Sequence, residues 1–351
     1  MFKTLNELFI FIIQTRYLLM PHSSTINRRF CVAPMMDWSD RHCRYFWRLF
    51  SKHAFLYTEM ITTGALLNGD VERFLQYNPE EHPVALQLGG SDPEALATCS
   101  KMAEEWQYDE VNLNCGCQSD RVKSGRFGAC LMAKPNLVGE CIQAMQEATN
   151  IPVTIKHRIG IDDQDEYEDL FTFVEKIRDG GCKTFIVHAR KAWLKGLSPK
   201  QNREVPPLLY DRVYQLKKEF PELEIIINGG ITTIEECQEH LKHVDGVMIG
   251  REAYHNPYLL AAVDQQLFSE ETDIVNRDHI LNEYIRYCDQ QIAAGSKLSF
   301  MSRHALGLFY KEKGGKIFRR YISENAPGLN ASSEVLRHAR EAMIAAVGIT
   351  E

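Results

Sequence analysis

The chain has 351 residues, 44% of them hydrophobic and 25% charged, and a formal net charge of −7 at pH 7. This is the composition of a globular protein with a large core, and the net negative charge argues against general attraction to nucleic acid, although not against a local basic strip. The ten cysteines have no paired, regular spacing, which indicates a reducing compartment, the cytoplasm, and not a disulfide scaffold.

The N-terminal segment is apolar enough over Leu5–Leu19 to suggest a signal peptide. Its apolar core, Leu8–Ile13, is short, however, and Arg16 follows closely without a cleavage site of small residues. We therefore expect neither secretion nor a membrane span. Residues 1–28 are interpreted as an extension, with Met20 as an alternative start of translation.

From Phe30 to about residue 260, short apolar strands alternate with polar turns and amphipathic segments. The expected strands are Cys31–Pro34, Phe55–Thr58, Val84–Leu88, Glu110–Asn114, Val153–His157, Thr184–His188, Glu224–Asn228 and Gly246–Ile249. Helices are expected between them, among others at Pro93–Trp106, Leu137–Thr149, Tyr167–Asp179 and Ile234–His240. Eight such repeats predict an α/β fold, a (β/α)8 TIM barrel over residues 29–268.

Beyond Ser269 the alternation stops. Residues 278–294, 302–311 and 333–347 have the apolar spacing of helices. The chain therefore predicts a smaller all-α domain over residues 269–351.

The predicted strands end in polar residues, and in such barrels the carboxyl ends of the strands build the active site. These ends include Pro34-Met35-Met36, Gln87-Leu88-Gly89-Gly90, Lys156-His157-Arg158 and His188-Ala189-Arg190. The last two strands end in Asn228-Gly229-Gly230 and Gly250-Arg251, where glycines let backbone N–H groups approach an anion. They predict a phosphate site. The position of Lys156 is compatible with three roles: a Schiff-base lysine, an electrostatic clamp or a member of an ion pair at the rim of the barrel.

Cys117 lies on a polar, glycine-flanked loop directly after the fourth strand. This setting favours a functional thiol over a buried structural cysteine, which is the interpretation for most of the other cysteines. Cys115 and Cys117 lack a second Cys or His pair at ligand spacing, so no metal site is predicted. A disulfide between them is implausible at such short spacing.

Two segments are locally basic. Residues 188–203 carry five positive charges and no acid, and residues 311–320 carry five positive charges and one acid. A solvated face is the usual explanation of such runs, and a nucleic-acid contact is the alternative.

Taken together, these motifs resemble those of the tRNA-dihydrouridine synthases, in particular their bacterial A subfamily, over about residues 29–350. The segments that carry the resemblance are Val32-Ala33-Pro34-Met35-Met36-Asp37-Trp38, Arg41-His42-Cys43-Arg44, Tyr57-Thr58-Glu59-Met60, residues 82–90, the Cys117 loop, residues 188–193 and Asp245–Tyr254.

The resemblance implies a tightly bound FMN in the barrel mouth, with NADPH as reductant. The residues that match its ligands are Pro34, Met35, Met36, Gln87, Lys156, His188, Asn228, Gly229, Gly230, Gly250 and Arg251. It also implies the reaction: hydride passes from FMN N5 to C6 of a tRNA uridine at position 20 or 20a, and Cys117 protonates C5.

The resemblance further implies that tRNA is the partner, contacted by Asn114, Lys200, Arg203, Lys316 and Arg319. The target base must leave the folded tRNA to reach the flavin. We expect a monomer that binds neither membrane nor metal. One departure concerns Gln118, because the family usually has proline after the catalytic cysteine; the loop loses a fixed φ and gains an N–H.

Two other functions remain open at this point. A flavin barrel that reduces a free pyrimidine would leave the helical domain without a purpose. A tRNA-binding folding factor with a vestigial redox site would act even without Cys117.

Overall fold

The computed structural model describes residues 26–118, 127–328 and 330–348, so Met20 and the segment around it lie outside the described residues. Eight parallel strands close into one barrel in chain order, and β8 pairs with β1. They are β1 (Phe30–Val32), β2 (Phe55–Thr62), β3 (Val84–Gly89), β4 (Glu110–Cys115), β5 (Val153–Arg158), β6 (Thr184–His188), β7 (Glu224–Asn228) and β8 (Gly246–Ile249).

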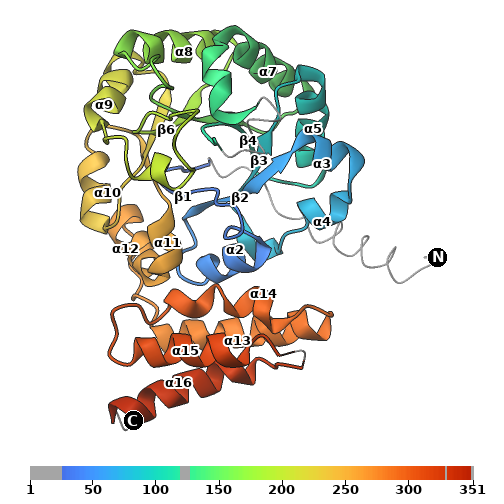
Figure 1. Cartoon of the computed structure of the whole chain (residues 1–351), viewed down its shortest axis with the longest axis vertical. Helices are drawn as coiled ribbons and strands as arrows, with labels where there is room; N and C mark the ends of the chain where they lie inside the picture. The colour runs from blue at the N-terminus through green and yellow to red at the C-terminus, as the bar shows by residue number, and fades with distance from the viewer. Residues whose placement is uncertain (1–25, 119–126, 329, 349–351) are drawn as a thin grey trace, which may run out of the picture.

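Helices surround the strands, as Figure 1 shows. Those of the barrel are α2 (Arg41–Arg48), α3 (Thr63–Asn68), α4 (Val71–Leu75), α5 (Pro93–Glu105), α7 (Pro135–Ala148), α8 (Tyr167–Asp179), α9 (Tyr210–Glu219), α10 (Ile234–His240), α11 (Arg251–His255) and α12 (Val263–Phe268). The predicted (β/α)8 barrel is confirmed. The last three strands and two of the predicted helices, α8 and α10, have the predicted bounds.

The barrel interior is apolar on one side and polar on the other. Alternate strand positions point inward, and the inner apolar cluster consists of Cys31, Ala33, Phe55, Tyr57, Ala85, Ile186, Ile226 and Met248. The opposite side carries the buried polar residues of β4 and β5. Below them, Arg28 forms ion pairs with Glu110 at 2.6 Å and Glu224 at 2.9 Å. The interior is therefore a filled core. A site is expected at the end of the barrel formed by the carboxyl ends of the strands, away from Arg28.

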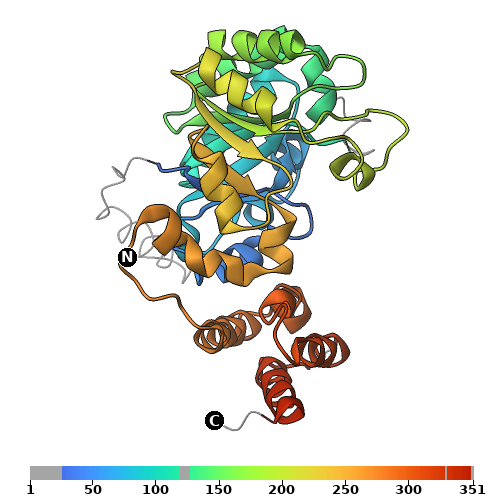
Figure 2. The ribbon, with the colours of Figure 1, turned by 90° about the vertical axis from the view of Figure 1, so that its left-hand side faces the viewer.

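Four more helices follow: α13 (Arg277–Ala293), α14 (Leu298–Ser302), α15 (Gly315–Asn325) and α16 (Glu334–Val347). Figures 1 and 2 show them gathered at one side of the barrel, against α2. The contact includes Tyr287, whose hydroxyl lies 2.7 Å from His42 Nδ1, and Asp40, which pairs with His304 at 3.1 Å. These contacts fix the helical part against the first turn of the barrel.

The prediction of a helix over residues 302–311 was wrong. Helix α14 ends at Ser302, and only a short 3-10 turn, Ala305–Gly307, follows it. Lys311 and Gly314 then adopt left-handed φ angles of 63° and 83°, which end helical continuity. The helix that does form here, α15, begins after these breaks.

Candidate active site

The predicted site residues on β3 to β7 come together at one end of the barrel. Gln87 lies on β3, Asn114 on β4, Lys156 on β5, His188 on β6 and Asn228 on β7. The strand register sets Asn114 beside Lys156 and His188 beside Asn228. Because parallel strands end at the same side, these side chains surround the mouth of the barrel.

Asn114 holds the Cys117 loop. Its Oδ1 accepts hydrogen bonds from the backbone N–H groups of Gly116, at 3.1 Å, and Cys117, at 3.0 Å. The backbone N–H of Ala129 donates to the Cys117 carbonyl at 2.7 Å. Cys117 is half-buried, and it acts electrostatically on Lys156 and Arg158, so it lies beside the residues of the mouth.

Cys115 differs from Cys117 in its burial. It lies fully buried among the apolar residues outside the barrel, and burial raises the pKa of its thiol well above the ordinary value. This agrees with a structural role. None of the ten cysteines, all of which the structure describes, forms a disulfide.

A chain of hydrogen bonds leads from the Cys117 loop into the barrel. Asn114 Nδ2 donates to Gln87 Oε1, Gln87 Nε2 to Asn112 Oδ1, and Asn112 Nδ2 to Thr154 Oγ1, each at 2.8 Å. Thr154 donates in turn to Glu110 at 2.5 Å. Each amide has one orientation that satisfies its neighbours, so the chain fixes the two ends of Gln87.

Asn112 and Thr154 were not among the predicted site residues. The available signal was the run of polar residues at alternate positions of β4, Glu110, Asn112 and Asn114, which share the inward face.

Lys156 and His188 are basic groups whose charge is suppressed. Burial and the nearby Arg158 lower the pKa of Lys156 to about 7, and its Nζ donates to Asn228 Oδ1 at 3.0 Å. Burial also lowers the pKa of His188 well below its ordinary value, with Arg158 and Lys156 acting in the same direction. The half-buried amine of Lys156 can gain a proton beside an anionic or electron-rich partner.

The backbone after β7 forms a cradle that side chains would fill. Gly229 and Gly230 have φ angles of 119° and 75°. A Cβ on Gly229 would lie 2.7 Å from the His188 ring, and one on Gly230 would lie 2.5 Å from Leu208. Glycine is thus required at both positions, and it leaves room for a ligand to approach the backbone.

Beside this cradle, Gly250 precedes Arg251, the first residue of α11. Arg251 pairs with Glu204 at 2.7 Å, and both side chains are largely exposed. Arg190 Nε is buried without a hydrogen-bond partner among the described residues. The glycine cradle and the unsatisfied Nε–H of Arg190 fit a phosphate group, although the role of Arg251 as its ligand stays a prediction.

Pro34, Met35 and Met36 follow β1 and form another part of the rim. The Met35 N–H donates to Ser39 Oγ at 2.9 Å, and Met36 is 52% exposed. An exposed methionine at the mouth can pack against a planar ring.

The structure separates the basic residues of the first strip. Arg190 donates to the Pro206 carbonyl, and Lys191 pairs with Asp165 at 2.7 Å. Lys200 and Arg203, at the turn Gln201–Arg203, are instead exposed. The first two therefore serve the fold, and the last two are accessible to a partner.

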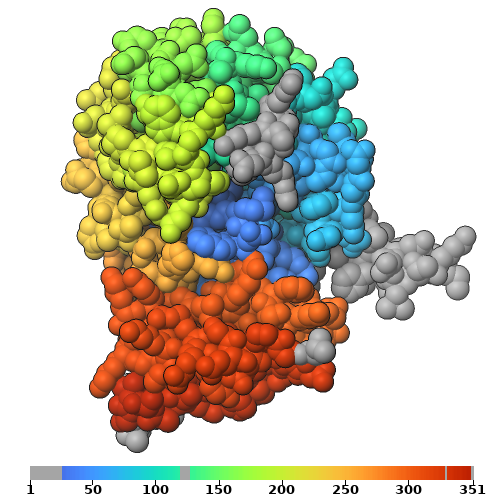
Figure 3. Space-filling model, viewed as in Figure 1, coloured from blue at the N-terminus to red at the C-terminus, as the bar shows by residue number. Residues whose placement is uncertain are grey.

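In the second strip, Lys316 is exposed and Arg319 half-buried on α15. Figure 2 shows that α15 and the segment between β6 and α9 are turned toward the same side of the molecule, and Figure 3 shows both on one face. One extended ligand can therefore reach both segments.

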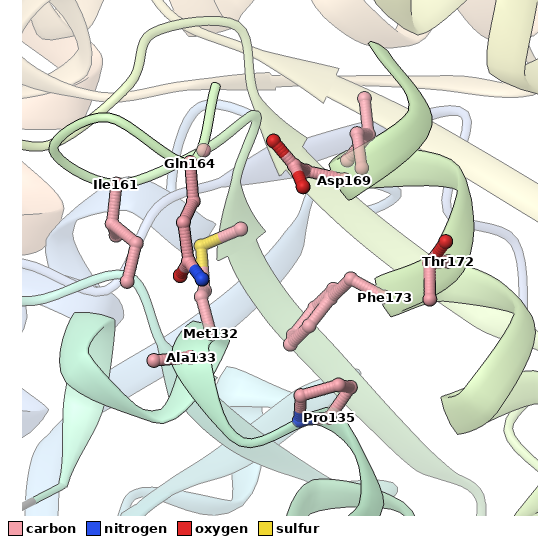
Figure 4. A pocket seen from close by; sticks show the side chains of 10 residues that line it. Met132, Ala133, Pro135, Ile161, Gln164, Asp169, Thr172 and Phe173 are labelled. Atoms are coloured by element: carbon pink, nitrogen blue, oxygen red, sulfur yellow. The ribbon is translucent and has the colours of Figure 1, made fainter. Parts of the chain in front are cut away.

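Two cavities lie near this end of the barrel. The first, of about 140 Å³, lies between the 3-10 helix Gly128–Ala133 and α8; Figure 4 shows it lined by Met132, Phe173, Gln164 and Asp169, none of which is a predicted site residue. The second, of about 370 Å³, is lined by the ends of β2 and β3, including Thr62 and Gly90. It adjoins the strand that carries Gln87.

No described helix has the length and apolarity to cross a membrane. Within residues 26–118, 127–328 and 330–348 there is also no cluster of three or more His, Cys, Asp or Glu side chains that could hold a metal ion.

Comparison with known proteins identifies close relatives. The sequence profile of the family described as dihydrouridine synthase (Dus) matches residues 31–344. The tRNA-dihydrouridine(20/20a) synthase of Vibrio vulnificus is 61% identical over 316 residues, 90% of this chain and 97% of the relative. The enzyme of the same name from Escherichia coli K12 is 54% identical over 323 residues, 91% of this chain and 93% of the relative.

Proposed function

The chain belongs to the dihydrouridine synthase family, and on this basis we propose that it reduces the C5–C6 double bond of uridines 20 and 20a in the D-loop of tRNA to 5,6-dihydrouridine. The observation that carries the proposal is the link through Asn114, which joins the Cys117 loop to Gln87. A thiol and a predicted flavin ligand thereby border the same mouth.

The residues at the mouth fit FMN. Gln87 offers a fixed amide to the pyrimidine edge of a flavin. An electron-rich flavin ring beside Lys156 would favour the protonated amine, which would in turn stabilise the ring. The glycines after β7 and β8 offer backbone N–H groups to its phosphate. Bound FMN, reduced by NADPH, would supply hydride to C6 of the uracil.

Cys117 supplies the proton in this proposal. A group that donates to C5 must be neutral, must reach the base and must be held in place. The two hydrogen bonds from the loop backbone to Asn114 meet the last requirement. Asn114 therefore positions the acid, and we further propose that it orients the uracil.

Contacts outside the mouth hold the RNA. A uracil within a folded tRNA must swing out to enter the pocket, and phosphate contacts hold the rest of the molecule meanwhile. Lys200 and Arg203, between β6 and α9, and Lys316 and Arg319, on α15, would supply four positive charges from two segments that share one face of the molecule. We expect the protein to act as a monomer in the cytoplasm.

The test is dihydrouridine formation by the purified protein with NADPH, offered either tRNA that lacks dihydrouridine or free UMP. Product on tRNA alone supports the proposal. Turnover of UMP would favour a free-pyrimidine reductase, and flavin binding without turnover of either would favour a tRNA-binding factor.

A further inference from the structure

One guanidinium contacts both neighbours of Cys117. Arg158, at the end of β5, is only 3% exposed. Its Nε donates to the Gly116 carbonyl at 3.2 Å, and its Nη2 donates to Gln118 Oε1 at 3.3 Å. The residue before the thiol and the residue after it are thus held by the same planar group.

The same guanidinium also holds the segment between β6 and α9. Its Nη1 donates to the backbone carbonyls of Asn202, at 3.0 Å, and Lys191, at 3.3 Å. Asn202 lies between Lys200 and Arg203, the two exposed cations of this segment. A rigid fork of donors therefore joins the thiol loop to the basic segment.

Gln118 is the residue of this arrangement that departs from the pattern of the resemblance. Proline, which the resemblance makes usual here, restrains the backbone by fixing φ, and glutamine does not. The Gln118 side chain is 3% exposed and bonds to Arg158, so a hydrogen bond takes the place of a covalent restraint.

We propose that Gln118 is a positioning residue for Cys117, which acts through Arg158 and holds the Cys117 loop in one arrangement with the Lys200–Arg203 segment. This inference rests on the proposed function, because it assigns Cys117 the role of acid. Loss of the Gln118 acceptor leaves a buried donor of Arg158 unsatisfied and releases one side of the thiol.

The test compares Gln118→Met, which keeps the length and removes the acceptor, with Gln118→Glu, which keeps an acceptor for Arg158. Gln215→Met is the matched control, because Gln215 bonds to Glu219 on the exposed face of α9. The readouts are kcat, the KM for tRNA, and the rate at which iodoacetamide alkylates Cys117, followed on its own peptide by mass spectrometry.

We expect kcat to fall roughly tenfold in Gln118→Met, with KM within about twofold, because a small displacement of the acid slows the chemical step and leaves RNA contacts intact. Alkylation of Cys117 should change several-fold in the same variant. Gln118→Glu and the control should stay near the wild type in all three. An unchanged alkylation rate and kcat in Gln118→Met would overturn the proposal, as would an equal loss in Gln118→Glu.

Arg158→Lys provides the second arm, because lysine keeps the charge and loses the fork. Here the KM for tRNA should rise together with the fall in kcat, since both segments are released. A change in kcat alone would refute the link to the basic segment. Wild-type protein that forms no dihydrouridine would refute the proposed function, whereas the alkylation rates would still report whether Gln118 holds the loop.

Discussion

The Asn114 carboxamide donates to the Gln87 carboxamide at 2.8 Å while its oxygen accepts two backbone N–H groups of the Cys117 loop. A single side chain thus fixes a predicted flavin ligand and the predicted acid. In the proposed reaction, hydride delivery to C6 and protonation of C5 would therefore both depend on the position of Asn114 at the end of β4.

The two functions of Asn114 can be separated by substitution. Asn114→Asp keeps the acceptor for the loop and loses the donor to Gln87, whereas Asn114→Ala loses both. We expect FMN to bind about tenfold more weakly in each, because Gln87 loses a buried partner. Asn114→Ala should also lower kcat by roughly 100-fold at saturating FMN, because it releases the Cys117 loop, and Asn114→Asp should lower kcat less. Flavin fluorescence titration and tRNA turnover measure the two effects, and identical behaviour of the variants would contradict the assignment.

Lys156 predicts a specific pH dependence of stability. Its pKa falls from 10.5 to about 7 in the folded protein, so between pH 7 and pH 10 the unfolded chain binds a proton that the folded flavin-free protein does not. The contribution of Lys156 to the free energy of unfolding therefore rises with pH across this window. Urea unfolding of the flavin-free proteins should show that the unfolding free energy of the wild type, relative to that of Lys156→Met, rises from pH 7 to pH 8. A difference independent of pH would show that the pKa is not lowered.

The basic residues of α15 predict a change in the salt dependence of tRNA binding. Removal of both charges in the double variant Lys316→Ala, Arg319→Ala should make the plot of log affinity against log salt less steep by about 1.5, since two phosphate contacts are lost. Exposed Arg286 and Arg337, each paired with a glutamate on its own helix, provide a control double variant. Equal slopes in the two double variants would place the RNA elsewhere.

Arg28 closes the floor of the barrel and should be a major determinant of stability. Arg28→Met leaves Glu110 buried without its cation, which is expected to cost about 3–5 kcal/mol of unfolding free energy. Arg178→Met removes a partly exposed ion pair and should cost at most about 1 kcal/mol. Urea denaturation of the two variants gives the comparison, and equal losses would contradict a structural role for the buried pair.

The barrel was predictable because its signal is local. Each strand is a short apolar run that ends in glycine or polar residues, as in Thr184–His188, and such a pattern needs no knowledge of the rest of the chain. The polar residues at the strand ends were predictable for the same reason, because parallel strands end at one side of a barrel.

The connections between site residues were not predictable. Arg158 stands at a strand end that the sequence analysis noted, yet its four acceptors come from two distant loops. These contacts form only in the folded protein. Helix α15 was missed although Phe318 and Ile322 lie four residues apart on its buried face, because Gly314 and Gly315 at its start are poor helix formers.

The most direct test of the central claim compares Cys117→Ala with Cys115→Ala in the reduction of tRNA that lacks dihydrouridine. The two thiols are two residues apart, but only Cys117 lies at the mouth, and Cys115 is fully buried. We predict that Cys117→Ala loses nearly all dihydrouridine formation while it still binds FMN and still accepts electrons from NADPH, and that Cys115→Ala keeps its activity. Full activity of Cys117→Ala would contradict the assignment of this thiol as the acid.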